Sequence, residues 1–154
     1  MPTDATVLVV GAGPTGLLLA SELCRRGVSC RLIDAHAGPL HWDRATVLHP
    51  RSLEVFESLG LSQPFLDAGV RQRIARLHSE GSVLGEIDLG GCGSRYGFNI
   101  GISEEMTERI LTDYLHRLGG DVMRASRLTD LRVNGNGMRA AIERDGATEE
   151  LPVE

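Results

Sequence analysis

The sequence predicts an α/β fold built on a parallel sheet, and three features of its first 34 residues support this. Residues 7–10 (Val-Leu-Val-Val) form a short apolar run, as in strands buried on both faces of a parallel sheet. A glycine-rich hexamer at 11–16 (Gly-Ala-Gly-Pro-Thr-Gly) follows at once and leads into an apolar helical segment. A second strand at 29–33 then ends at Asp34. Strand, glycine loop, helix and strand in this order predict a βαβ unit.

The residues of the glycine loop each suit a phosphate-binding turn. Gly11 lets the strand turn sharply, Gly13 lets the backbone approach a phosphate, and Gly16 lets the helix pack against the sheet. Pro14 fits the first helical turn, where its missing N–H costs no hydrogen bond, and Thr15 can add a hydroxyl donor to the phosphate. The free N–H groups and the positive dipole end of the helix favour a pyrophosphate. The loop therefore predicts a dinucleotide site.

An acidic residue completes this pattern. Asp34 lies 18 positions after Gly16, close to the roughly 20-residue spacing of the carboxylate that accepts ribose hydroxyls. Glycine hexamers also occur by chance, so the alternative is an ordinary βαβ turn with Asp34 as a solvated strand end. We favour the dinucleotide site because strand, loop, helix and acid all fall in register.

The middle of the chain predicts a helix and a hairpin. A loop at 35–49 precedes a helix that begins at Pro50 and ends at Gly60. Two strand-like runs, 74–78 and 83–89, flank a Gly-Ser turn and predict an antiparallel excursion from the parallel sheet.

The last third of the chain predicts another helix and a second hairpin. Ser103 can cap a helix whose apolar stripe continues to a Gly-Gly pair. A short strand at 121–123 follows. The Asn-Gly-Asn-Gly sequence at 134–137 then predicts a hairpin turn between strands at 127–133 and 138–143.

Composition limits the classes of function. A chain of 154 residues can build one sizeable core, and a net charge of −5 argues against nucleic acid as a partner. No apolar run is long enough to span a membrane, and residues 1–20 lack the basic start of a signal peptide. Cys24, Cys30 and Cys92 show no paired spacing, so we expect reduced thiols, the first two packed in a core, and a cytoplasmic protein. No pattern predicts a metal site or a catalytic side chain.

Four pieces of the chain occur in an order that is specific. They are the loop segment at 11–17, Asp34, the segment at 44–54 (Arg-Ala-Thr-Val-Leu-His-Pro-Arg-Ser-Leu-Glu) and the segment at 107–111 (Thr-Glu-Arg-Ile-Leu). In these pieces the chain resembles the FAD-dependent aromatic hydroxylases of the para-hydroxybenzoate hydroxylase type, above all their polyketide- and antibiotic-tailoring branch. The resemblance implies FAD as cofactor, NAD(P)H as reductant, and hydroxylation of a small aromatic substrate, polyketide-like or phenolic, with O2.

The resemblance also implies which residues contact the cofactor. They are Gly11, Gly13, Pro14, Thr15, Gly16, Asp34, Ala35, Arg44, Ala45, Glu104 and Leu128. Arg44 would reach the ribityl and flavin region with its fork of donors, although an exposed loop arginine is the alternative. Leu128 would lie beside the adenine. Asp34 replaces a commoner glutamate and would still accept two ribose hydroxyls.

Glu104 departs from the family pattern. It stands where family members often carry a glutamine whose amide touches the ribityl chain. Its carboxylate would either place charge near the phosphates or simply favour the N-terminus of its helix, and both interpretations stay open.

The resemblance implies a Rossmann-like FAD-binding domain that is only partly present. Its nucleotide-binding part would comprise residues 1–72 and 101–154, and residues 73–100 would form a hairpin directed to a mostly absent substrate domain. Further family motifs would lie beyond residue 154, so we expect the chain alone to be inactive. Two alternatives stay open: a truncated fragment with weak or no FAD binding, and an NAD-binding dehydrogenase module. The substrate, the choice between NADH and NADPH, and the oligomeric state are not predicted.

Overall fold

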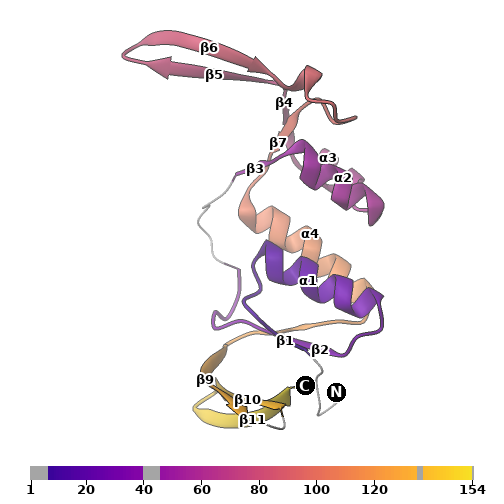
Figure 1. Ribbon diagram of the computed structural model, residues 1–154, viewed down its shortest axis with the longest axis vertical. Coiled ribbons are helices and arrows are strands. Elements are labelled where there is room, and N and C mark those ends of the chain that lie inside the picture. The colour runs from indigo at the N-terminus through magenta and orange to yellow at the C-terminus, as the bar shows by residue number, and fades with distance from the viewer. Residues whose placement is uncertain (1–6, 40–45, 135–136, 154) are drawn as a thin grey trace. The chain divides into compact units, whose positions relative to one another are not determined.

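Two compact units make up the chain. The computed structural model describes residues 7–39, 46–134 and 137–153, and its elements are shown in Figure 1. The discontinuous unit comprises Met1–His41 and Glu108–Glu154, and the inserted unit comprises Trp42–Thr107. The predicted division at residues 73–100 remains a prediction.

A parallel sheet and a helix open the discontinuous unit. Strands β1 (Val7–Val10), β2 (Cys30–Ile33) and β8 (Val122–Met123) lie in the order β1-β2-β8, all parallel, and helix α1 (Pro14–Arg25) joins β1 to β2. Gly27 follows the end of the helix with a φ of +71°, a conformation that glycine adopts without strain. The predicted βαβ unit and the short strand at 121–123 are confirmed.

Helix α4 (Glu104–Arg117) begins in the inserted unit and continues into the discontinuous one. The Ser103 hydroxyl accepts a hydrogen bond from the Met106 N–H at 3.1 Å, which confirms the predicted cap. Leu111 and Leu115 of its apolar stripe are fully buried. Just after the helix, a Cβ on Gly120 would lie 3.0 Å from the Cys24 Sγ, so α4 and α1 end close together.

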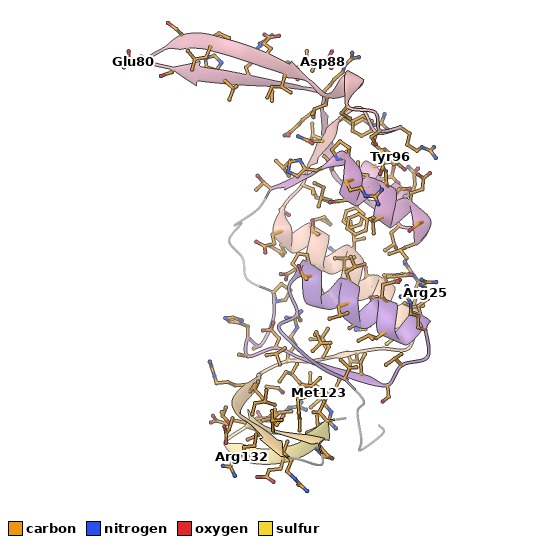
Figure 2. All side chains as sticks on the ribbon, viewed as in Figure 1. Arg25, Glu80, Asp88, Tyr96, Met123 and Arg132 are labelled. Atoms are coloured by element: carbon orange, nitrogen blue, oxygen red, sulfur yellow. The ribbon has the colours of Figure 1, made fainter. Side chains whose placement is uncertain are left out.

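An antiparallel sheet completes the discontinuous unit. Strands β9 (Ser126–Asn134), β10 (Gly137–Arg144) and β11 (Ala147–Val153) lie in the order β11-β10-β9. The predicted hairpin is confirmed, and its central turn residues, 135–136, lie outside the described residues. The buried core of this region consists of Ile33, Ala140, Ile142, Leu151 and Val153. Met123, labelled in Figure 2, packs against this core and so connects the parallel sheet to the antiparallel sheet.

Two packed helices and a small sheet form the base of the inserted unit. Its elements are β3 (Val47–Leu48), α2 (Pro50–Ser58), α3 (Ser62–Ala68), β4 (Val70–Gln72), β5 (Ile74–Ser79), β6 (Ser82–Asp88), the 3-10 turn η1 (Leu89–Gly91) and β7 (Asn99–Gly101). The helix predicted from Pro50 is confirmed, whereas α3 was not predicted. Phe56 of α2 stacks on Phe65 of α3 with ring centroids 4.2 Å apart. Strands β3 and β4 both pair antiparallel with β7.

The predicted hairpin forms a separate two-stranded ribbon from β5 and β6. Ser79 pairs with Ser82, so the turn residues are Glu80 and Gly81, one position before the predicted Gly-Ser pair. Both have positive φ, 50° and 78°, as a tight two-residue hairpin turn requires. Glu80 marks the tip of the ribbon and Asp88 its opposite end in Figure 2.

The helices are all short. Within the part of the chain that the structure describes, none combines the length and apolar character needed to cross a membrane.

Candidate dinucleotide site

Glycine occupies the three loop positions for different structural reasons. Gly11 takes a φ of +100°, and its N–H donates to the Ile33 carbonyl at 2.8 Å, so the turn itself requires a glycine there. A Cβ on Gly16 would collide with the Gly11 carbonyl oxygen, so helix packing requires the second glycine. At Gly13 the backbone is extended (φ −73°, ψ 179°), and among the described residues an added Cβ would meet only the Glu108 Oε1, at 3.8 Å. Neither strain nor packing against the described part of the chain therefore explains Gly13.

The N-terminus of α1 has the features of a candidate anion site. Pro14 occupies the first helical turn, as predicted, and Gly13 before it has no side chain that could cap the helix. Thr15 is exposed beside that end. The first N–H groups of a helix lack partners within the helix, and its dipole places partial positive charge there. This end of α1 can therefore receive a phosphate group at Gly13.

Asp34 is buried and extensively bonded. It is 9% exposed, and its Oδ2 accepts a hydrogen bond from the Ala12 N–H at 2.7 Å. Its Oδ1 lies 2.8 Å from the His36 backbone nitrogen, which donates to it, and 3.1 Å from the His36 Nδ1. The carboxylate thus fixes the middle of the glycine loop, and it is not the solvated strand end of the alternative interpretation.

The environment of Asp34 favours its ionised form. Burial on its own would raise the pKa of this carboxyl, but the hydrogen bonds from Ala12 and His36, helped by the charge of Arg124, outweigh burial and lower it. Asp34 is therefore a carboxylate at neutral pH, able to accept hydrogen bonds from a hydroxylated ligand.

The chain after β8 wraps around the end of β2. The Asp34 N–H donates to the Met123 carbonyl at 2.9 Å, and the Ser126 N–H donates to the Asp34 carbonyl at 2.8 Å. Ala125 takes a φ of +52°, which is uncommon for a residue with a Cβ. Arg124 lies beside the carboxylate, with its Nη1 3.9 Å from the Asp34 Oδ2. Sequence reasoning missed Arg124, because no local pattern marks a residue that follows a two-residue strand.

Glu108 is a second buried acid at the loop. It is 7% exposed, and its Oε1 is the atom that a Cβ at Gly13 would approach. It belongs to the segment 107–111, which sequence reasoning used for the resemblance without giving Glu108 a role. The structure thus connects that segment of α4 to the glycine loop.

Seven of the predicted site residues lie in one short region of the discontinuous unit. They are Gly11, Gly13, Pro14, Thr15, Gly16, Asp34 and Ala35, the last of them exposed. Arg44 and Ala45 lie outside the described residues. Glu104 begins α4 in the inserted unit, and Leu128 of β9 packs against the core of the antiparallel sheet. Their contacts with a cofactor stay predictions.

The two cysteines of the discontinuous unit lie together. The Cys24 and Cys30 sulfur atoms are 3.8 Å apart and half-buried, without a disulfide between them. Burial raises the pKa of the Cys30 thiol to about 11. Within the described ranges, no group of three or more His, Cys, Asp or Glu side chains is placed to hold a metal ion.

Comparison with known proteins identifies the family. The family described as "FAD binding domain" matches residues 4–153. The chain is 35% identical to 6-methylpretetramide 4-monooxygenase of Streptomyces rimosus over 99% of its own length and 28% of that protein. It is 33% identical to pentachlorophenol 4-monooxygenase of Sphingobium chlorophenolicum over 96% of the chain and 28% of the relative.

A solved structure shows the same architecture. The anhydrotetracycline hydroxylase OxyS from Streptomyces rimosus superposes with a TM-score of 0.84 at 26% identity, over 97% of this chain and 30% of that one. The chain thus spans less than a third of these relatives. It belongs to the FAD-binding domain family, and the relatives it resembles are named as monooxygenases and a hydroxylase.

Proposed function

We propose that this chain binds the adenosine diphosphate half of FAD at the glycine loop, as part of a monooxygenase that hydroxylates an aromatic substrate. The observation that carries the proposal is Gly13. Gly11 and Gly16 are explained by backbone conformation and helix packing, whereas Gly13 has ordinary φ and ψ and, among the described residues, room for a Cβ. A glycine in such a place, at a helix N-terminus, is accounted for by a phosphate that approaches the backbone.

Different residues of the chain would bind different parts of the cofactor. The N-terminus of α1 faces the pyrophosphate, with Thr15 as a further donor, and Asp34 accepts a ribose hydroxyl from its place beside Ala12. Ala35, Arg44, Ala45, Glu104 and Leu128 would make the remaining contacts that this chain supplies. When bound, FAD supplies the redox chemistry with O2. No catalytic side chain is proposed within these 154 residues.

The proposed overall reaction consumes NAD(P)H, a proton and O2. One oxygen atom enters the aromatic ring as a hydroxyl and the other leaves as water. A phenolic or polyketide-like ring is the proposed substrate class, supported by relatives named for pentachlorophenol and 6-methylpretetramide. Because the chain spans 28% of these relatives, we propose that it shows no turnover alone. NAD(P)H oxidation and O2 uptake by the isolated chain, coupled to a hydroxylated product, would contradict that part of the proposal.

The binding proposal is tested by flavin fluorescence during titration of the chain with FAD. Gly13→Val should abolish binding, because the side chain would occupy the space needed by the pyrophosphate. Gly85→Val is the matched control, since Gly85 lies in β6 and no atom of the described residues is within 4 Å of an added Cβ. Saturable binding that is lost only in Gly13→Val supports the proposal. Binding of NAD(P) without FAD would instead favour a dehydrogenase module, and binding of neither would favour an inactive fragment.

A further inference from the structure

We propose that Arg124 is a second ribose-binding residue, which holds one hydroxyl of the adenosine ribose jointly with Asp34. The inference rests on the proposed function, because it requires the adenosine half of FAD to lie at Asp34. Arg124 is absent from the site residues that the sequence predicts.

The Asp34 carboxylate has few acceptor positions left for a ligand. An ionised carboxylate has about four acceptor positions, two on each oxygen. The His36 N–H and ring nitrogen lie against Oδ1, and the Ala12 N–H occupies one position on Oδ2. Among the described residues, these contacts leave one position, on Oδ2. Asp34 alone therefore has room for one ribose hydroxyl, not the two expected from the sequence.

Arg124 lies beside the Asp34 carboxylate. Its Nη1 lies 3.9 Å from the Oδ2 that retains this position, too far for a direct hydrogen bond but close enough to share a ligand atom. A ribose hydroxyl can donate to the carboxylate and at the same time accept from the guanidinium, because a hydroxyl does both. Both bonds would be charge-assisted, which makes them stronger than bonds between neutral groups.

The backbone holds Arg124 in this position. Ser126 is 1% exposed, and its hydroxyl donates to the Arg124 carbonyl at 3.1 Å. The Ala125 N–H donates to the His36 carbonyl at 3.0 Å, across from β8 to the segment that follows β2. These two hydrogen bonds hold Ala125 in its left-handed conformation. The Arg124 side chain itself is only 21% exposed, so it is not a free surface arginine.

The test compares ADP with 2′-deoxy-ADP and 3′-deoxy-ADP by calorimetry, in the unmodified chain and in Arg124→Met. This substitution keeps much of the side-chain length but removes every donor. We expect Arg124→Met to weaken ADP binding about tenfold, and one deoxy analogue to bind the unmodified chain about tenfold less tightly than ADP. The difference in affinity between that analogue and ADP should shrink in Arg124→Met, because the hydroxyl then keeps only the Asp34 carboxylate as partner. Arg124→Lys should restore part of the difference.

Arg132→Met is the matched control, since Arg132 lies on β9, is 69% exposed and pairs with Asp130. It should leave all three affinities unchanged. Equal discrimination between ADP and both analogues in the unmodified chain and in Arg124→Met would overturn the inference while FAD binding stands. So would an unmodified chain that binds all three nucleotides alike. Failure of the unmodified chain to bind either FAD or ADP would overturn the proposed function as well.

Discussion

Adding one methyl group at two positions of the same loop should separate folding from binding. Gly16→Ala places a Cβ far inside the 3.0 Å that real Cβ atoms keep from other heavy atoms, against the Gly11 carbonyl oxygen and 3.1 Å from its carbonyl carbon. Both obstacles are backbone atoms, so α1 must move away from the end of β1. Gly13→Ala places its Cβ 3.8 Å from the Glu108 Oε1 in an extended conformation that alanine adopts freely.

The expected magnitudes follow from these contacts. Overpacking against backbone places Gly16→Ala at the upper end of the usual range, about 3 kcal/mol of lost unfolding free energy. For a domain of this size that corresponds to a fall in Tm of about 6–12 °C. Gly13→Ala should leave stability unchanged or raise it by about 0.4–1 kcal/mol, since alanine restricts the unfolded chain. Its FAD affinity should nevertheless fall at least about tenfold, because the methyl group lies in the path of the phosphate.

Denaturant unfolding followed by circular dichroism measures the first quantity, and flavin fluorescence titration measures the second. Equal destabilisation by Gly13→Ala and Gly16→Ala would contradict these different roles of the two glycines. So would FAD binding by Gly13→Ala as tight as that of the unmodified chain, because Gly13 would then have no ligand to accommodate.

Three further perturbations have defined outcomes. Because the folded pKa of Asp34 is lowered below its ordinary 3.8, its stabilisation is present above that pH and is lost as pH falls through the folded value. The stability difference between the unmodified chain and Asp34→Asn, measured by unfolding from pH 2 to 7, should therefore shrink toward acid; a constant difference contradicts this. Ala125→Gly should stabilise the chain by up to about 1 kcal/mol by removing left-handed strain, whereas Asp145→Gly, also at φ 52°, should gain less since aspartate tolerates that conformation. The hydrogen bonds from Arg73 and the Gly90 N–H lower the pKa of Asp88 to about 2, so carboxyl NMR titration of Arg73→Ala should move it toward 3.8; no movement would refute the pairing.

The sequence predicts the elements whose signals are local. The apolar run at 7–10, the loop glycines and the Asn-Gly-Asn-Gly sequence are local signals, and the structure confirms the strands, helix and hairpin that they predict. The short strands β3 and β4 were not predicted because two or three residues carry no periodicity, and their pairing with β7 defines them.

The site is predictable only in part for the same reason. Gly11 and Gly16 have the roles expected from the motif, and Asp34 has the expected place. Arg124 is 90 positions from Asp34 in the sequence. Its approach to the Asp34 carboxylate depends on the left-handed backbone of Ala125, which no sequence pattern predicts. The hydrogen bond from the Ala12 N–H to Asp34 is likewise a tertiary contact, and it reduces the number of carboxylate acceptor positions that remain for a ligand.

The interruption of the discontinuous unit by residues 42–107 has a consequence for how the protein folds. The β1-α1-β2 segment is contiguous, but the bonds that close around Asp34 come from residues 123 and 126, after the whole inserted unit. Closing so long a loop costs conformational entropy before any contact can offset it, so these hydrogen bonds form late. During synthesis, the first βαβ unit leaves the ribosome long before its partners β8 and β9 exist. The ribose end of the site should therefore be among the last parts of the molecule to become native, and hydrogen exchange during refolding should protect the Ser126 amide later than the Leu17 amide of α1.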